Sequence, residues 1–457
     1  MKKLTIILSV LFFLSSCELF TIDDDMNLDP NQPNTASAPQ LLANAMRYLP
    51  GLSSNPDANF YGQYLAETQY AVQSRYPDES WSFYYYYQNP LINTQIVLNN
   101  SSVDNELAVA KILKAYFFWH VTDRWGDVPY SEALQGEKNL VPAYDRQEDI
   151  YNSLFKLLDE ADEQINESLS LSNDQVFGGD MTKWKRTANT IHLLMALRLS
   201  EVNPEKGRTE FNKALENGIM LSNDDNFTYH PLADQNNENY WYNQIDRASR
   251  EWWALTESFV DLLAPLDDPR LPVYADPARQ SGDYIGQPLG YDPAPENAEL
   301  FSLLGEQQHQ QDSPVPLVTY AQALFAKAEA VELGWITEDA GDNYNKAVEA
   351  SILQWTGSDD TVEDYLNQPD VAYDGTIEQI ATQRYIHLFL HGYEAWAEWR
   401  RTGFPAFVVP IKGNPVPTRQ RYSEDEAANN TDNYQEAVDR QFGGENTMYG
   451  KVWWDVD

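Results

Sequence analysis

The sequence predicts an all-α fold, in which helical hairpins are separated by large, loop-rich insertions. Two observations indicate this fold. Apolar residues recur every three to four positions over most of the chain, which is the period of an amphipathic helix. The stretches between these periodic segments are long and rich in proline, asparagine and aspartate, which break helices and form turns.

The periodic segments predict where the helices lie. Residues 108–121 carry apolar side chains at helical spacing, and residues 151–165 place Leu154, Leu158 and Ala161 on one stripe. Further helices are expected over residues 190–201, 210–220, 255–263, 320–333, 343–354 and 378–400.

Three of these helices share a local pattern near their start. An aromatic residue is followed two or three places on by a small one. The pairs are Tyr151 with Ser153, Phe211 with Ala214, and Tyr344 with Ala347. In tetratricopeptide repeats a small residue lets two helices approach closely, and an aromatic residue fills the gap to the next hairpin. The pattern therefore favours tetratricopeptide-like hairpins, and a generic α-helical bundle is the alternative.

Two long stretches between the predicted helices, residues 223–251 and 266–316, combine turn residues with tyrosine and tryptophan. Loops of this length inside a compact domain are usually functional or disordered. Their aromatic content argues against disorder. We therefore expect these insertions to be ordered and to carry function.

The charge of the chain excludes one class of ligand. The formal net charge is −39, and aromatic residues make up 13% of the sequence. A strongly acidic surface repels the phosphates of nucleic acids, so a nucleic-acid-binding protein is excluded. The aromatic content indicates a folded core in spite of the high charge.

The N-terminus reads as a lipoprotein signal. Two lysines precede an apolar run that is too short for a permanent membrane span, and Leu14-Ser15-Ser16-Cys17 follows. This ending matches the lipobox of bacterial lipoproteins, in which the cysteine is lipidated, and Cys17 is the only cysteine. We predict a signal peptide over residues 1–16, a lipidated tether over 17–39 and one domain over 40–457. A signal peptide with a chance cysteine is the alternative.

No metal, cofactor or catalytic motif stands out. Asp25-x-Asn27-x-Asp29 resembles the start of a calcium loop, but Pro30 replaces the required glycine and no closing glutamate follows. His387 and His391 lack the glutamate of a zinc protease. There is no phosphate-binding glycine loop and no nucleophile elbow. We predict no cofactor, while accidental carboxylate pairs leave a glycoside hydrolase open.

Several motifs, taken in chain order, resemble those of the SusD/RagB superfamily, in particular the SusD-like outer-membrane lipoproteins of Bacteroidetes. The two most specific are Trp-Gly-Asp-Val-Pro-Tyr at residues 125–130 and Arg-Arg-Thr-Gly-Phe-Pro at residues 400–405. The others are Asp-Pro-Asn-Gln-Pro at 29–33, Lys-Ala-Glu-Ala at 327–330, Arg-Gln-Arg-Tyr at 419–422 and Val-Trp-Trp-Asp at 452–455. The resemblance covers nearly all of the chain after the signal peptide.

This resemblance implies a fold and a function. It implies a tetratricopeptide-like scaffold with a large irregular part packed on one side. It also implies a cell-surface lipoprotein of the outer membrane that is not an enzyme. Such a protein captures oligosaccharides or polysaccharides and delivers them to a SusC-like TonB-dependent transporter. Peptide capture, as in the RagB branch, is the alternative within the superfamily, and a surface glycoside hydrolase is the alternative outside it.

Aromatic residues are the candidates for glycan binding, because a sugar ring stacks its apolar face on an aromatic ring. Four consecutive tyrosines, residues 84–87, cannot all face one core, so some must be exposed. We predict Tyr84 and Tyr85 as ligand contacts, and the resemblance implies Trp81 as part of the sugar platform. The insertions supply the remaining candidates, Tyr240, Trp241, Tyr284 and Tyr291.

Other conspicuous residues are interpreted as structural. Trp252 and Trp253 precede an apolar helix and are expected to pack. Asp127 is expected to cap a turn after Gly126 ends the preceding helix. Arg400 and Arg401 are expected to support the fold.

Overall fold

The computed structural model describes residues 36–291 and 297–456. The chain divides into two compact units, Met1–Ser37 and Ala38–Asp457, and the description below concerns the second. Both the predicted lipidation site at Cys17 and the calcium-like segment at residues 25–30 lie outside the described residues.

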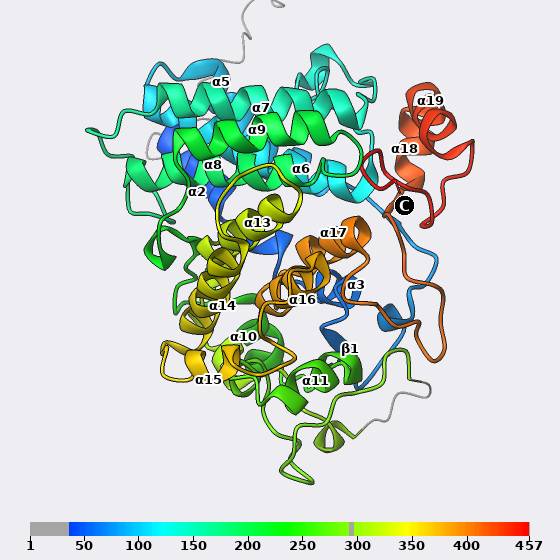
Figure 1. Ribbon diagram of the computed structural model, residues 1–457. Helices are drawn as coiled ribbons and strands as arrows, with labels where there is room; N and C mark the ends of the chain where they lie inside the picture. Colours follow the sequence, from blue (N-terminus) through cyan, green and yellow to red (C-terminus); the bar gives the residue numbers. More distant parts are fainter. Residues whose placement is uncertain (1–35, 292–296, 457) are drawn as a thin grey trace, which may run out of the picture. The chain divides into compact units, whose positions relative to one another are not determined.

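Four pairs of helices form the scaffold (Figure 1). They are α6 (Asp104–Trp125) with α7 (Gln147–Gln164), α8 (Met181–Leu197) with α9 (Pro204–Asn217), α13 (Tyr320–Glu332) with α14 (Ala340–Thr356), and α16 (Ile377–His387) with α17 (Gly392–Thr402). Helix α7 also packs against α8, so the first two pairs form a continuous stack. The predicted all-α, tetratricopeptide-like scaffold is confirmed.

The aromatic positions of the repeat pattern lie between helices, as predicted. Phe211 is buried and meets Trp335 edge to face, with ring centroids 5.7 Å apart. Gly207 lets α9 approach α8, because a Cβ there would lie 2.9 Å from the carbonyl oxygen of Ala196. Tyr344 is buried beside Phe325 of the neighbouring helix α13. The pattern therefore marks real hairpin contacts.

The prediction of one continuous helix over residues 378–400 is wrong, because this segment forms two helices, α16 and α17. Helix α16 ends at His387, and Leu390 takes a positive φ of 60° before α17 starts at Gly392. Gly392 packs so closely on helix α3 (Pro56–Tyr61) that a Cβ would lie 1.9 Å from the carbonyl oxygen of Ala58. The break thus turns α17 against a distant part of the chain, which periodicity alone does not reveal.

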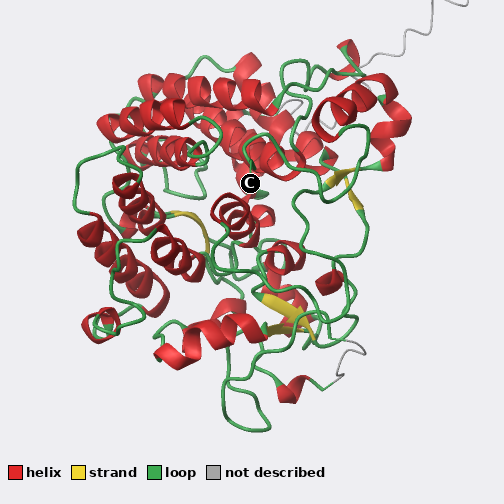
Figure 2. Cartoon of the chain, turned by 45° about the vertical axis from the view of Figure 1, so that its right-hand side comes forward, coloured by secondary structure: helices red, strands yellow, loops and turns green. Residues whose placement is uncertain are grey.

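Three two-stranded sheets tie distant segments together (Figure 2). Strand β1 (Leu65–Glu67) pairs antiparallel with β4 (Trp253–Leu255), and β3 (Phe227–Tyr229) pairs antiparallel with β5 (Val315–Val318). Strand β2 (Ser80–Trp81) pairs in parallel with β6 (Arg421–Tyr422). Leu255, predicted to open a helix, is the last residue of β4, and the helix starts at Glu257 after the N-cap Thr256.

The remaining helices are short. They are α2 (Ala38–Met46), α3, α4 (Tyr84–Tyr86), α5 (Ile92–Asn100), α10 (Tyr240–Tyr242), α11 (Glu257–Leu263), α12 (Leu271–Tyr274), α15 (Val362–Leu366), α18 (Glu424–Asn429) and α19 (Thr431–Phe442). Two π-helical turns, η5 (Tyr87–Leu91) and η8 (Asn243–Arg247), continue α4 and α10. The insertion around α10–α12 packs around a second apolar core, in which Phe259 and Tyr274 meet Tyr64 and Phe389 from outside the insertion.

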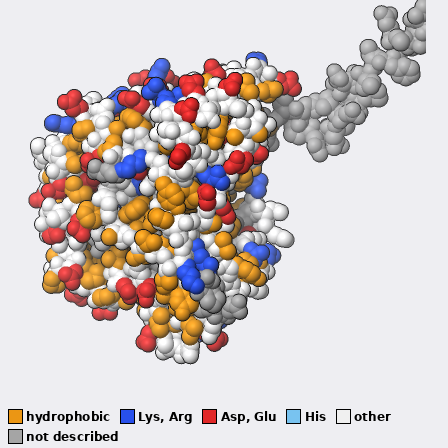
Figure 3. Space-filling view, turned by 90° about the vertical axis from the view of Figure 1, so that its right-hand side faces the viewer, with side chains coloured by type: hydrophobic (Ala, Val, Ile, Leu, Met, Phe, Trp, Pro, Cys, Tyr) orange, Lys and Arg blue, Asp and Glu red, His pale blue; other side chains and the backbone are white. Residues whose placement is uncertain are grey.

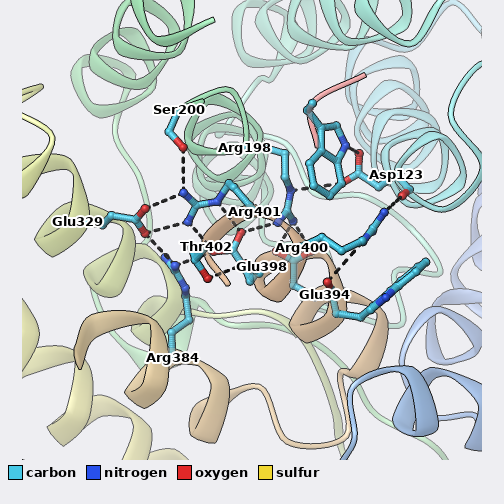
Figure 4. A network of polar contacts seen from close by, with 12 residues as sticks. Asp123, Arg198, Ser200, Glu329, Arg384, Glu394, Glu398, Arg400, Arg401 and Thr402 are labelled. Carbon is cyan, nitrogen blue, oxygen red and sulfur yellow. Dashed lines mark hydrogen bonds and ion pairs between the residues drawn. The ribbon is translucent and has the colours of Figure 1, made fainter. Parts of the chain in front are cut away.

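A buried network of ion pairs joins four scaffold helices (Figure 4). Glu398 of α17 forms ion pairs with Arg384 of α16 at 2.6 Å and with Arg401 at 2.7 Å, and it also pairs with Arg198, which follows α8. Glu329 of α13 pairs with Arg384 at 2.7 Å and with Arg401 at 2.6 Å. Burial opposes ionisation of Glu398, but the surrounding guanidinium groups hold its pKa well below the usual range. Arg401 therefore supports the fold, as predicted.

The same network includes Trp454, which lies far from the other members in the sequence. Asp123 of α6 pairs with Arg198 at 3.3 Å and accepts a hydrogen bond from the Trp454 indole at 2.7 Å. Arg400 donates to the carbonyl oxygen of Asp123 at 2.9 Å, and its guanidinium lies 3.7 Å from the centroid of the Trp396 ring. Both predicted structural arginines are thus buried in the scaffold.

Gly126 ends α6 with φ 86°, as predicted. The Asp127 carboxylate does not cap a turn directly after Gly126; it accepts from the Gln147 backbone N–H at 2.8 Å at the start of α7 and from Arg440 at 2.6 Å. His387 is a buried histidine whose two ring nitrogens meet the hydroxyls of Thr319 at 2.7 Å and Ser351 at 3.0 Å.

Candidate functional site

The four consecutive tyrosines, residues 84–87, lie partly in the core and partly at the surface, as predicted. Tyr86 and Tyr87 are buried in the main core, Tyr84 is half-buried, and Tyr85 is 53% exposed. The Tyr85 ring meets the Tyr48 ring edge to face at 5.6 Å. The Asn89 side chain donates to the carbonyl oxygen of Tyr85 at 2.7 Å across the π-helical turn. Helix α4 thus presents one tyrosine ring outward on a fixed backbone.

Tyr85 and Tyr240 come from distant parts of the chain and line one depression of about 390 Å³. We call it the amide depression, because most of its other polar side chains are amides. They include Asn55, Gln235, Asn236, Asn237, Asn243 and Gln244. Amides both donate and accept hydrogen bonds, as sugar hydroxyls do. Rings flanked by amides form a surface suited to a neutral, hydroxyl-rich ligand.

Only two charged side chains line the amide depression, Arg47 and Glu238. Hydrogen bonds from Arg247, at 2.5 and 2.7 Å, lower the pKa of Glu238 to about 2, with help from Asn243 and Gln311. Glu238 is therefore ionised and already paired at neutral pH. It cannot serve as a general acid, and it adds little net charge for a ligand.

Helix α10, which carries Tyr240 and forms one wall of the amide depression, is held by hydrogen bonds to the loop before β5. Asn239 caps α10 by accepting from the Trp241 backbone N–H at 2.7 Å. Its own backbone N–H donates to the Gln311 carbonyl oxygen at 2.8 Å, and its side chain donates to the Ser313 carbonyl oxygen at 2.9 Å. Trp241 is 1% exposed and packs against Trp253 beneath the surface. Its ring supports the wall and offers no face to a ligand.

A second depression, of about 450 Å³, lies on the other side of η8. We call it the tryptophan depression. It is lined by Trp252, Phe301 and Leu303 together with polar residues. Glu251 and Arg279 form an ion pair at 2.7 Å, and a ring nitrogen of His309 lies 2.6 Å from a carboxylate oxygen of Asp246. Trp253 is buried, as predicted, and its neighbour Trp252 is partly buried; both line this depression.

The other predicted site residues lie elsewhere. Trp81 is partly buried in β2, where its carbonyl oxygen accepts from the Trp125 indole at 3.0 Å. The small cavity beside it, of about 10 Å³, has room for about one water. Tyr284 packs on the core of the insertion, and Tyr291 is 41% exposed. Neither Tyr284 nor Tyr291 lines either depression.

A carboxylate near the tryptophan depression gives the stability a pH dependence. Burial raises the pKa of Glu67, in β1, to about 7, whereas an unfolded glutamate titrates near 4.3. Between these pH values the folded state keeps a proton that the unfolded chain has lost, so stability falls as the pH rises from about 4.3 to about 7 and stays lower above pH 7. Glu67→Gln is expected to raise the melting temperature at pH 8 and to change it little at pH 4, as measured by thermal denaturation.

The matched control for this prediction is Glu137→Gln, which changes an exposed glutamate in a short turn. It is expected to leave the melting temperature unchanged at both pH values. An equal effect of Glu67→Gln at pH 4 and pH 8 would contradict the assignment.

Within residues 36–291 and 297–456, no helix is long and apolar enough to cross a membrane. The same residues contain no cluster of three or more histidine, cysteine, aspartate or glutamate side chains placed to hold a metal ion.

Comparison with known families decides the identity of the fold. Residues 30–423 match the model of the family SusD-like_2, described as starch-binding and associating with the outer membrane. The chain belongs to this SusD-like family. The resemblance seen in its sequence motifs is confirmed, and the family match spans most of them. No curated protein sequence matches the chain significantly.

Solved structures of SusD-like proteins share the whole fold. A chitin-binding protein is 31% identical, with a TM-score of 0.81, and the match covers 92% of this chain and 100% of that one. An outer-membrane protein from Bacteroides vulgatus, described as probably involved in nutrient binding, is 26% identical over the same shares, with a TM-score of 0.82. A SusD homologue from Bacteroides fragilis is also 26% identical, with a TM-score of 0.81, over 92% of this chain and 99% of that one.

Proposed function

We propose that this SusD-like protein captures neutral oligosaccharides at the cell surface and delivers them to a SusC-like TonB-dependent transporter. The observation that carries the proposal is the meeting of Tyr85 and Tyr240 in one amide-lined depression. The hydroxyl groups of both tyrosines have no hydrogen-bond partner among the described residues, so they are free to bind a ligand. The chitin-binding relative supports a glycan as the ligand.

The charge of the site supports a neutral glycan. The chain carries a formal net charge of −39, and acidic side chains are spread over the face seen in Figure 3. A polyanionic glycan would be repelled by such a surface.

The site also supports binding without catalysis. Glycoside hydrolysis commonly needs two carboxyl groups, one of them protonated. Glu238 is the single carboxyl group among the residues that line the amide depression, and its low pKa keeps it ionised. Incubating the protein with glycans should therefore release no new reducing ends.

Delivery to a transporter and anchoring through Cys17 complete the proposal. The family description places such proteins with the outer membrane. A pull-down in mild detergent is expected to recover a TonB-dependent transporter with the lipoprotein. Recovery of the lipoprotein alone at several detergent strengths would contradict this part of the proposal.

Binding is tested by removing the exposed rings. Tyr85→Ala and Tyr240→Ala should each weaken binding by about 1–3 kcal/mol, the range found for ring-stacking contacts, or roughly 5- to 150-fold. Isothermal titration calorimetry against chitin-type, β-glucan and α-glucan oligosaccharides measures this, with melting curves to confirm folding.

Tyr449→Ala is the matched control for these variants, because Tyr449 is 46% exposed and lines neither depression. It should bind as the wild type does. Unchanged affinity of both Tyr85→Ala and Tyr240→Ala at unchanged stability would remove the amide depression from the site. Tight binding of peptides and of no glycan would favour the peptide-capturing branch instead.

A further inference from the structure

The segment between α17 and β6 exposes aliphatic side chains to solvent. We call residues 404–412 the aliphatic loop, because Val408, Val409 and Ile411 are all exposed, the last two to 65% and 62%. The segment lies at the right-hand edge of Figure 1, and Figure 3 faces that side and shows hydrophobic side chains in its middle and lower parts. Single exposed aliphatic residues are ordinary, whereas a group of them marks a surface that contacts a partner or a membrane.

Hydrogen bonds to distant residues hold the backbone of the aliphatic loop. The Gln63 side chain donates to the Val408 carbonyl oxygen at 2.7 Å and accepts from the Val408 N–H at 2.9 Å. The Ile411 N–H donates to the Leu289 carbonyl oxygen at 2.9 Å. The two prolines of the loop have no N–H group. Several backbone polar groups of the loop are thus bonded or absent, which lowers the cost of moving it out of water.

The other side of the aliphatic loop packs on the domain. The Phe407 ring stacks on the Trp399 ring, with centroids 4.6 Å apart and an angle of 4° between the ring planes. Pro410 is buried, and a Cβ at Gly290 would lie 2.4 Å from the Pro410 Cβ. The folded domain therefore supports the loop from below while its aliphatic side chains stay exposed.

Acidic residues are missing from this part of the sequence. The chain has 70 aspartates and glutamates, about one in every six or seven residues, yet none occurs between Glu398 and Glu424. Lys412 belongs to the loop, and Arg75 lies beside it, because the Arg75 carbonyl oxygen accepts from the Asn414 N–H at 3.0 Å. The aliphatic loop is thus a part of this strongly acidic chain that can approach an anionic surface with little repulsion.

The composition of the loop favours lipid over protein as the surface that covers it. Binding hot spots between proteins are rich in tryptophan, tyrosine and arginine, whereas the exposed residues here are aliphatic. No loop residue lines the amide depression or the tryptophan depression. Exposed Tyr291 follows Gly290, whose carbonyl oxygen accepts from the Lys412 N–H at 3.2 Å. A phenol ring and a long ammonium side chain at the edge of an aliphatic surface suit the boundary between lipid and water.

We propose that the aliphatic loop inserts into the lipid surface of the outer membrane and orients the anchored domain on it. The family description associates such proteins with the outer membrane. A chain as long as the predicted tether, residues 17–39, spans up to about 80 Å when extended and does not by itself orient a domain. The loop supplies the second contact. This inference goes beyond the proposed function, because it does not depend on which ligand the protein captures.

The contact is weak alone and effective in the anchored protein. A few aliphatic side chains bury little apolar area, and stable membrane binding takes two signals. A lipid anchor keeps the loop near the membrane, so the second contact forms at a high effective concentration. The contact of the loop itself is therefore measured without the anchor and at high lipid concentration.

The first test uses residues 17–457 with Cys17→Ala, sedimented with phosphatidylcholine vesicles. Adding Val409→Asp and Ile411→Asp together should lower the bound fraction by about ten-fold or more, because charged side chains do not enter lipid. The control adds Leu169→Asp and Leu221→Asp, two leucines of the scaffold that are 58% and 63% exposed. It introduces the same charge and should bind as the parent chain does. Melting curves confirm that both variants are folded.

The second test places a fluorescent label on the loop. Cys17 is the only cysteine, so Val409→Cys in the Cys17→Ala chain provides a single site for an environment-sensitive dye. With vesicles that contain nitroxide-labelled phosphatidylcholine, the dye at residue 409 should be quenched. The same dye on Leu221→Cys should not be quenched.

Three outcomes would overturn the inference. In the first, both double variants bind vesicles as the parent chain does. In the second, the dye at residue 409 is quenched no more than the dye at residue 221. In the third, that dye is shielded only when a purified transporter is added, which would assign the loop to a protein interface. None of these results touches glycan capture, which the calorimetric titrations decide separately.

Discussion

Glu398→Gln is expected to lower the free energy of unfolding by about 3–5 kcal/mol, the range found when one partner of a buried ion pair is removed. Glu398 is 8% exposed and pairs with three guanidinium groups, those of Arg198, Arg384 and Arg401. A glutamine retains the shape but not the charge, so buried cations lose a counter-ion. Urea denaturation at neutral pH measures the loss.

Lys346→Ala provides the matched comparison. Its ion pair with Asp342 has a similar distance, 2.6 Å, but the two side chains are 54% and 58% exposed. Water screens such a pair, so this substitution should leave the urea midpoint nearly unchanged. An equally small shift for Glu398→Gln would mean that the buried network contributes no more than a surface pair.

Cys17→Ala is expected to move the protein completely from the membrane fraction to the soluble fraction. The reason is that acyl chains on this cysteine would supply the membrane affinity, and stable anchoring takes two or more such chains. Fractionation in cells lacking the transporter measures the effect, because a partner could otherwise retain the protein. Ser15→Ala, which leaves the cysteine in place, should stay with the membrane. Sedimentation of Cys17→Ala with membranes would contradict the lipid anchor.

The helical scaffold could be predicted because its signals are local. Aromatic and small residues at the starts of helices, such as Phe211 and Ala214, mark the hairpins directly in the sequence. The break at Leu390 could not be predicted, because its cause is the approach of Gly392 to Ala58, far away in the chain. The pairing of β1 with β4 could not be predicted for a similar reason, because the two strands lie far apart in the sequence.

The candidate site was predicted only in part. The sequence named Tyr85 and Tyr240 as ligand contacts, and the structure places both in one depression, while their role in binding stays a prediction. Trp241 is buried against Trp253, whereas Trp252 lines a depression. The sequence around each residue does not reveal this difference, because it depends on contacts made in the folded chain.

The position of Trp454 in the scaffold has a consequence for how the protein is made. Its ring is fully buried beside Asp123, and the Trp453 backbone N–H donates to Gln147 at 2.8 Å. Residues synthesised more than 280 positions after α7 thus close the interior around α6 and α7. The first hairpins therefore stay incompletely packed until this later segment has been synthesised. Chains cut short before Trp453 would leave this interior open, which makes them ready substrates for proteases.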